Sequence, residues 1–160
     1  ETFNSTKKEL TNMITAKFNG DDVKIPTSWG DVSYKNYISY TKTDNRLEQV
    51  SILVGIEKSR LEKLNSESLG SILMAMSFTT EEPSAYMAEL NSTDVGRESY
   101  GKIEMAKAIL LGNEKPIDAV LPILKLYTGI DYADMPTDIV HPLGAFFLLS
   151  CIAFSSDTNG

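Results

Sequence analysis

The chain lacks the residues on which several classes of protein depend. Its 160 residues include one cysteine, one histidine and one tryptophan. Because Cys151 has no second cysteine to pair with, no internal disulfide forms, and this excludes a small scaffold built on disulfides. Cys151 lies among apolar neighbours, so we interpret it as a buried, inert thiol.

Long apolar runs and excess positive charge are also missing. The longest nearly apolar run, residues 143–154, is much shorter than the roughly 20 residues of a spanning helix, so we interpret it as core and expect no membrane association. The formal net charge is −7, whereas phosphate contacts need clustered Lys and Arg, so we expect no direct nucleic-acid binding. Because the chain starts at Glu1 without a Met, we expect a trimmed, matured or excised N-terminus.

The overall composition is that of a globular protein. Hydrophobic residues make up 42% and charged residues 23%, which argues against wholesale disorder or a fibrous repeat. A chain of this length fits one domain. We therefore predict a single mainly helical domain over residues 13–154, preceded by an N-terminal segment, 1–12, and followed by a polar tail, 155–160.

The first part of that domain has the pattern of a β-hairpin. Apolar and polar residues alternate along 14–18, and Asn19-Gly20 then supplies a turn before a second short apolar stretch. This predicts a hairpin over about residues 13–26, ended by Pro26, which has no backbone N–H to donate. A helix over residues 7–17 is the open alternative, because the apolar residues there also fit one helical face.

The remainder predicts a compact bundle of five to seven helices. Apolar residues recur at helical spacing between N-cap residues and glycine stops. The predicted helices cover 33–41 with Ser33 as N-cap, about 44–55, 59–64, 66–76 with Ser66 as N-cap, 100–112, 116–127, and a last one from near Pro142. Breaks are expected at 79–84 and 91–96, with a short apolar segment between them, and Pro122 should kink or split its helix.

A weak internal repeat of a helix pair is also indicated. Gly55-Ile56 and Leu69-Gly70 recur 74 residues later as Gly129-Ile130 and Leu143-Gly144. If the repeat holds, Ile72 and Phe146, which lie two residues after Gly70 and Gly144, occupy matching places in the core.

No motif with the spacing of a phosphate, dinucleotide or zinc site is present, so we expect no cofactor, no metal and no enzyme activity. The competing enzyme hypothesis rests on His141 with the acids between Asp131 and Asp138. A nucleophile pair of His141 and Cys151 requires the last helix to reverse on itself. The acids lack the pattern of a calcium-binding loop, so we interpret them as a solvated loop with Asp138 helping a turn, and Glu81-Glu82 as ordinary surface charge.

Two Asn-Ser-Thr triplets, at Asn4 and Asn91, match the pattern for N-glycosylation. That pattern counts only in a secreted eukaryotic protein. We therefore interpret both triplets as chance matches.

The most distinctive local signal surrounds the only tryptophan, Trp29. It lies between a proline stop and a capped amphipathic helix, and we expect either Trp29 or Val32 to pack back over the first helical turn. We interpret Trp29 as a structural residue between the hairpin and the helices. Tyr34 and Tyr37 share one face of that helix while Tyr40 points away, which favours a core with a rim over a nucleic-acid platform. The residues we assign to structure or interaction are Trp29, Tyr34, Tyr37, Phe146 and Phe147.

The stretch from Ile25 to Tyr37 resembles the opening of small tailed-bacteriophage proteins that are encoded among virion and tail-assembly genes. The stretches 52–69, 120–136 and 145–148 are similar to later parts of the same proteins, so the likeness spans about residues 13–150. It implies a non-enzymatic virion structural or assembly protein, tail-assembly chaperone-like, that binds other phage virion or tail proteins in the virion or the host cytoplasm. A small bacterial regulatory or adaptor binding module is the alternative.

Overall fold

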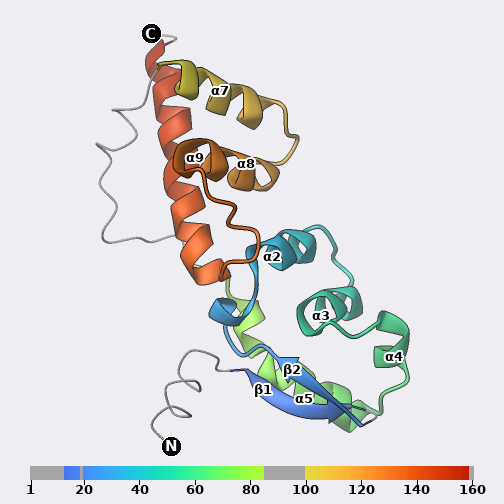
Figure 1. Cartoon of the computed structure of the whole chain (residues 1–160). Helices are drawn as coiled ribbons and strands as arrows, with labels where there is room; N and C mark the ends of the chain where they lie inside the picture. Colours follow the sequence, from blue (N-terminus) through green and yellow to red (C-terminus); the bar gives the residue numbers. More distant parts are fainter. Residues whose placement is uncertain (1–12, 19, 85–99, 159–160) are drawn as a thin grey trace, which may run out of the picture. The chain divides into compact units, whose positions relative to one another are not determined.

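The computed structural model describes residues 13–18, 20–84 and 100–158, and its chain divides into two compact units, 1–83 and 84–160 (Figure 1). The described part is mainly helical with an N-terminal antiparallel hairpin, which confirms the predicted fold class. The division differs from the single domain expected over residues 13–154. Each unit has buried apolar side chains of its own, and these supply two small cores in place of one.

The hairpin of the first unit consists of β1 (Ile14–Phe18) and β2 (Asp21–Ile25). The strands pair antiparallel with Ile14 opposite Ile25. Gly20 adopts a positive φ of 87°, which a turn between two strands favours and most other residues resist. The prediction of a hairpin ended by Pro26 is confirmed. The helical alternative is wrong for residues 14–17, and its remaining part up to residue 12 lies outside the described residues.

The junction after the hairpin is shaped by side chains that bond to nearby backbone. A single turn, η1 (Trp29–Asp31), is followed by α2 (Tyr34–Thr41). The Asp31 carboxylate accepts hydrogen bonds from the backbone N–H of Thr27 at 3.0 Å and from the hydroxyls of Thr27 and Ser28, each at 3.3 Å. Ser33 accepts from the backbone N–H of Asn36 at 3.4 Å, so its predicted role as N-cap is confirmed.

In the described part of the first unit, α2 is followed by three further α-helices and a short turn: α3 (Arg46–Val54), α4 (Lys58–Glu62), α5 (Ser66–Ala75) and η2 (Ser77–Thr80). Gly55 ends α3 in the left-handed conformation, as predicted. The assignment of Ser66 as an N-cap is wrong, because Asn65 accepts from the backbone N–H of Ser68 at 2.8 Å and Ser66 is the first helical residue. Both residue types cap helices well, so sequence could not separate neighbours.

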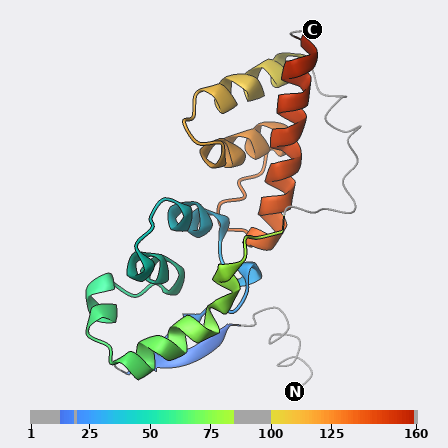
Figure 2. The ribbon, with the colours of Figure 1, turned by 180° about the vertical axis from the view of Figure 1, so that it is seen from behind.

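The core of the first unit draws on β2, η1 and the four helices α2 to α5. Figures 1 and 2 show α5 running beside the hairpin from both viewing directions, and α3 contacts β2 as well as α2 and α4. The buried apolar side chains of these segments include Ile25, Trp29, Tyr34, Tyr37, Val50, Leu53, Leu61, Ile72 and Met76.

The described residues of the second unit form a bundle of three helices: α7 (Tyr100–Leu111), α8 (Ile117–Thr128) and α9 (Thr137–Thr158). Both α7 and α8 pack on α9 and on each other (Figures 1 and 2). Their buried cluster contains Ala106, Ala119 and Ile123. Small alanine side chains at these positions let the helix backbones approach closely.

Two predictions about the last helix are corrected. We expected it to begin near Pro142, but α9 begins at Thr137, because the backbone N–H groups of Ile139 and Val140 both donate to the carbonyl oxygen of Pro136 at 3.1 Å. Pro142 is buried within the helix. The backbone stays helical to Thr158, so residues 155–158 of the expected polar tail extend α9.

The sequence predicted a kink or a split at Pro122. The split is wrong, since α8 runs unbroken from Ile117 to Thr128, and the kink stays a prediction. Pro122 is exposed, so its ring lies on the solvent side of the helix. A helix tolerates the loss of one N–H donor when its other face packs against neighbours, as the buried Val120, Ile123 and Leu124 do here.

The predicted repeat is matched in part by local geometry. Gly129 ends α8 with a φ of 74°, as Gly55 ends α3 with a φ of 78°. The second glycines differ: a Cβ added at Gly70 meets nothing within 4 Å, whereas one at Gly144 would lie 2.5 Å from Cγ1 of Val120. Ile72 is buried and Phe146 half-buried. Superposition of the two helix pairs stays a prediction.

Trp29→Ala should reduce the free energy of unfolding by about 3–5 kcal/mol, because it removes a large side chain that is only 9% exposed. Urea denaturation followed by circular dichroism measures the loss. Met74→Ala is the control, since Met74 is 78% exposed and its truncation should change stability by less than about 0.5 kcal/mol. A near-zero effect at Trp29 would show that its packing is dispensable.

Gly144→Ala should destabilise the second unit by about 1–3 kcal/mol, because the new methyl group overlaps the buried, rotamer-restricted side chain of Val120. Gly70→Ala is the matched variant in an open helical position, and there we expect a gain of about 0.5–1 kcal/mol. Adding Val120→Ala to Gly144→Ala tests the cause: if the pair shows no coupling, the contact with Val120 is not responsible.

Candidate functional site

Trp29 is the centre of an aromatic cluster in the first unit. Its ring packs edge-to-face against three others, with centroid separations of 5.1 Å to Tyr37, 5.5 Å to Tyr40 and 5.0 Å to Phe78. Its Nε1–H donates to the backbone carbonyl oxygen of Glu81 at 2.9 Å. Edge-to-face rings and a bonded indole N–H are what a buried tryptophan prefers. The predicted packing of Trp29 over the first turn of α2 is therefore confirmed.

The two tyrosines assigned with Trp29 are core residues. Tyr34 is 1% exposed and Tyr37 7%, and their rings lie 5.7 Å apart. Burial raises the pKa of Tyr34 well above its usual value, and the neighbouring Tyr37 adds to this. The pKa of Tyr37 is raised chiefly by burial, then by the negative charge of Glu82, then by Tyr40. Tyr40 is half-buried, as expected of a rim.

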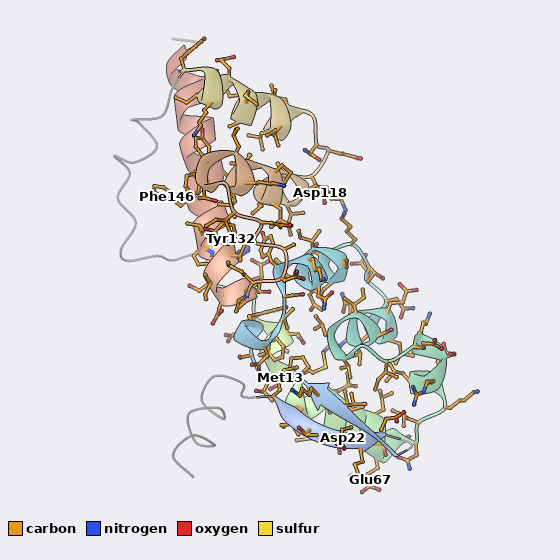
Figure 3. The ribbon with its side chains drawn as sticks, in the orientation of Figure 1. Met13, Asp22, Glu67, Asp118, Tyr132 and Phe146 are labelled. Atoms are coloured by element: carbon orange, nitrogen blue, oxygen red, sulfur yellow. The ribbon has the colours of Figure 1, made fainter. Side chains whose placement is uncertain are left out.

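The other two assigned residues, Phe146 and Phe147, lie on α9 in the second unit (Figure 3). Phe147 stacks on Tyr127 of α8, with centroids 5.1 Å apart and an interplanar angle of 18°, and it meets the edge of Phe146 at 5.4 Å. Both phenylalanines are half-buried. The five assigned residues thus form two groups, one in each unit.

A groove of about 540 Å³ lies between the hairpin and α5 in the first unit, and we call it the hairpin groove. Met13 on the hairpin and Glu67 on α5, labelled in Figure 3, mark the two elements that border it. Ile25 and Ile72 are buried at its floor, while Ile14 is 48% exposed at its rim. The other lining residues are Ala16, Lys17, Leu64, Ser68, Ser71 and Ala75.

The strand that borders the hairpin groove is an edge strand within the described part of the chain. There, the sheet has two strands, and β1 pairs with β2 alone. The second edge of such a strand presents backbone N–H and C=O groups to any further strand. Sequence reasoning found the alternation of Ile14 and Ala16 but could not show that α5 leaves space over them.

A smaller pocket of about 210 Å³ opens beside the aromatic cluster, and we call it the Trp29 pocket. Trp29, Tyr37 and Tyr40 line one part of it, and Glu81, Glu82 and Pro83 line another. We had interpreted Glu81-Glu82 as ordinary surface charge. Nothing in the sequence indicates that a segment more than 50 residues after Trp29 folds against it.

The two residues of the candidate nucleophile pair are not brought together. His141 and Cys151 are ten residues apart on the continuous helix α9, which separates their backbones by about 15 Å along its axis. The side chain of Cys151 lies outside the described residues. We also looked for groups of three or more His, Cys, Asp or Glu side chains that could hold a metal ion. The described residues contain none.

The acidic loop behaves as a local structural element. The Asp131 carboxylate accepts from the backbone N–H of Ala133 at 3.0 Å, which makes a turn, and Asp138 lies in the first turn of α9. The turn residue is thus Asp131, whereas we had assigned Asp138. The triplets at Asn4 and Asn91 lie outside the described residues.

Among the described helices, none is long and apolar enough to cross a membrane. No family model, curated protein or solved structure matches the chain.

The free energy of unfolding should fall as the pH rises above about 10, where tyrosines of the unfolded chain ionise. The raised pKa values of Tyr34 and Tyr37 keep both side chains neutral in the folded state, so their contribution is complete below pH 10 and is lost above it. Tyr34→Phe should reduce the slope between pH 10 and 11.5, measured by urea denaturation. The exposed Tyr100→Phe is the control, and equal slopes for the two variants would contradict the prediction.

Proposed function

We propose that this protein is a non-enzymatic assembly protein that acts by binding other proteins, in the manner of a phage tail-assembly chaperone or of a small component kept in the virion. Its partners are other virion or tail proteins, and its place is the virion or the host cytoplasm. The observation that carries the proposal is the hairpin groove, an open and mainly apolar groove beside an edge strand.

The groove suits an extended segment of a partner protein. A segment laid along β1 would pair its backbone with the outer edge of that strand, and every second side chain would enter the groove. Ile14 at the rim, with Ile25 and Ile72 at the floor, offers apolar contact for those side chains. The groove therefore fits a strand whose apolar residues alternate with polar ones. Such a strand, when exposed on an unassembled virion protein, promotes aggregation unless it is covered.

Charge adds a second requirement for the partner. Among the described residues that line the groove, Lys17 is the one that carries a charge. It lies near the C-terminal end of β1. An acidic residue of the partner segment would pair with it, at the modest gain of an exposed ion pair, about 0.2–1 kcal/mol. The preferred partner segment is therefore extended and alternately apolar, with a carboxylate opposite Lys17.

Ala16→Arg should weaken binding of the partner by about tenfold or more, because it places a long charged side chain in the groove. Thr15→Arg is the matched control, since Thr15 is exposed on the other face of the same strand and does not line the groove. The measurement is calorimetric titration of the full chain with each purified virion and tail protein encoded beside it.

Two results would contradict the proposal. Absence of binding to every co-encoded virion and tail protein removes the assembly role. Binding that Ala16→Arg and Thr15→Arg weaken equally removes the groove as the site. Binding to a co-encoded regulatory protein in place of virion proteins would support the adaptor alternative and overturn the phage assignment.

A further inference from the structure

A site of a different kind lies at the Trp29 pocket. We propose that this pocket binds a primary alkylammonium group, the chemistry of a lysine side chain. Its volume of about 210 Å³ is below the about 300–1,000 Å³ of sites for drug-sized ligands, so it suits one side chain in place of a cofactor. All of its lining residues belong to the first unit.

Aromatic rings form one part of the lining. Trp29, Tyr37 and Tyr40 all contribute, and their rings are held by edge-to-face contacts between Trp29 and each tyrosine. The faces of such rings carry partial negative charge and attract cations within about 6 Å of the ring centre. They also offer apolar contact to the methylene groups of an alkyl chain.

The charged side chains that line the pocket are both negative. Glu81 and Glu82 both line it and are exposed, and no lysine or arginine is among its described lining residues. The carboxylate of Glu82 is close enough to Tyr37 to raise the pKa of that hydroxyl, although burial is the larger cause. A cation bound between the rings and this carboxylate is attracted from both sides.

The hydroxyl groups of the lining are oriented as acceptors. Thr41, Thr79 and Thr80 donate their hydroxyl hydrogens to the carbonyl oxygens of Ile38, Met76 and Ser77, at 2.7–2.9 Å. The indole N–H of Trp29 is likewise used by the Glu81 carbonyl oxygen. Since these donors are engaged inside the protein, what the threonine hydroxyls offer to a ligand is oxygen lone pairs, which an ammonium N–H needs.

One of these hydroxyls already accepts from a cation. The Arg46 guanidinium donates from Nη2 to Oγ1 of Thr79 at 2.9 Å, the same oxygen whose hydrogen goes to Met76. Arg46 itself does not line the pocket. The contact occupies the Thr79 oxygen, and it leaves Thr41, Thr80 and the two carboxylates for an incoming ammonium group.

The test uses Trp29 itself, because the only tryptophan of the chain lines the pocket and its fluorescence reports on occupancy. The full chain is titrated with Nα-acetyl-lysine N-methylamide and with the norleucine derivative that has the same alkyl chain without the ammonium group. We expect a saturable change in the millimolar range for the lysine derivative only, weakened in high salt by screening. Equal changes with both derivatives, or no saturable change with either, would overturn the proposal.

Variants locate the site. Glu82→Gln should weaken binding by about fivefold, and Tyr40→Leu by about two- to fivefold, through loss of the ion pair and of the cation–ring contact. Glu62→Gln removes an exposed carboxylate of the first unit that does not line the pocket, and it should leave binding unchanged. Circular dichroism confirms that each variant is folded. An unchanged affinity in Glu82→Gln would place the ammonium group elsewhere and overturn the proposal.

Two further probes distinguish a lysine of a partner protein from a small alkylamine as the source of the ammonium group. They are a ten-residue peptide with one central lysine and n-pentylammonium. Tighter binding of the peptide than of the free amine identifies a lysine of a partner protein. Equal or tighter binding of the free amine identifies a small alkylamine. Failure of both would overturn the proposal and would leave the hairpin groove unaffected, because the two sites share no lining residue.

Discussion

The hydrogen bond from the indole N–H of Trp29 to the carbonyl oxygen of Glu81 is the contact on which the first unit depends most. It joins residues 52 positions apart, and the edge-to-face packing of Trp29 on Phe78 reinforces it. Each aromatic pair adds about 0.5–1.5 kcal/mol beyond the area buried, and the buried bond adds about 1 kcal/mol. Together these contacts close the unit, because they bring the segment after α5 back against the start of α2.

Local chemistry brings Trp29 to that place. Pro26 ends the hairpin, Asp31 holds the turn by accepting from Thr27 and Ser28, and Ser33 caps α2. These short-range hydrogen bonds fix the local backbone and so the direction in which the Trp29 side chain points. The stretch from Ile25 to Tyr37 is therefore a folding element in this chain. The hairpin groove and the Trp29 pocket both adjoin it, because Ile25 lines the first, and Trp29 and Tyr37 line the second.

The second unit is held differently, by close contact of helices. Ala106 and Ala119 are fully buried, and Gly144 passes so near Val120 that a methyl group has no room. The stacked rings of Tyr127 and Phe147 extend the contact between α8 and α9. Stability there comes from small residues at helix crossings and from ring stacking. Around Trp29, by contrast, the three ring contacts of the indole are edge-to-face, and Tyr37 stacks on Tyr40.

By itself the sequence determined the hairpin, the caps at Ser33 and the stops at Gly55 and Gly129, because alternation, side-chain capping and positive φ act over a few residues. It misplaced the start of α9 and allowed a break of α8 at Pro122 that does not occur, since packing in the bundle outweighs the local cost of a proline. Only the tertiary structure decided that Glu81 and Glu82 meet Trp29, and that α5 leaves a groove over Ile14. Contacts between distant segments depend on how whole elements pack, and no short pattern of residues records that.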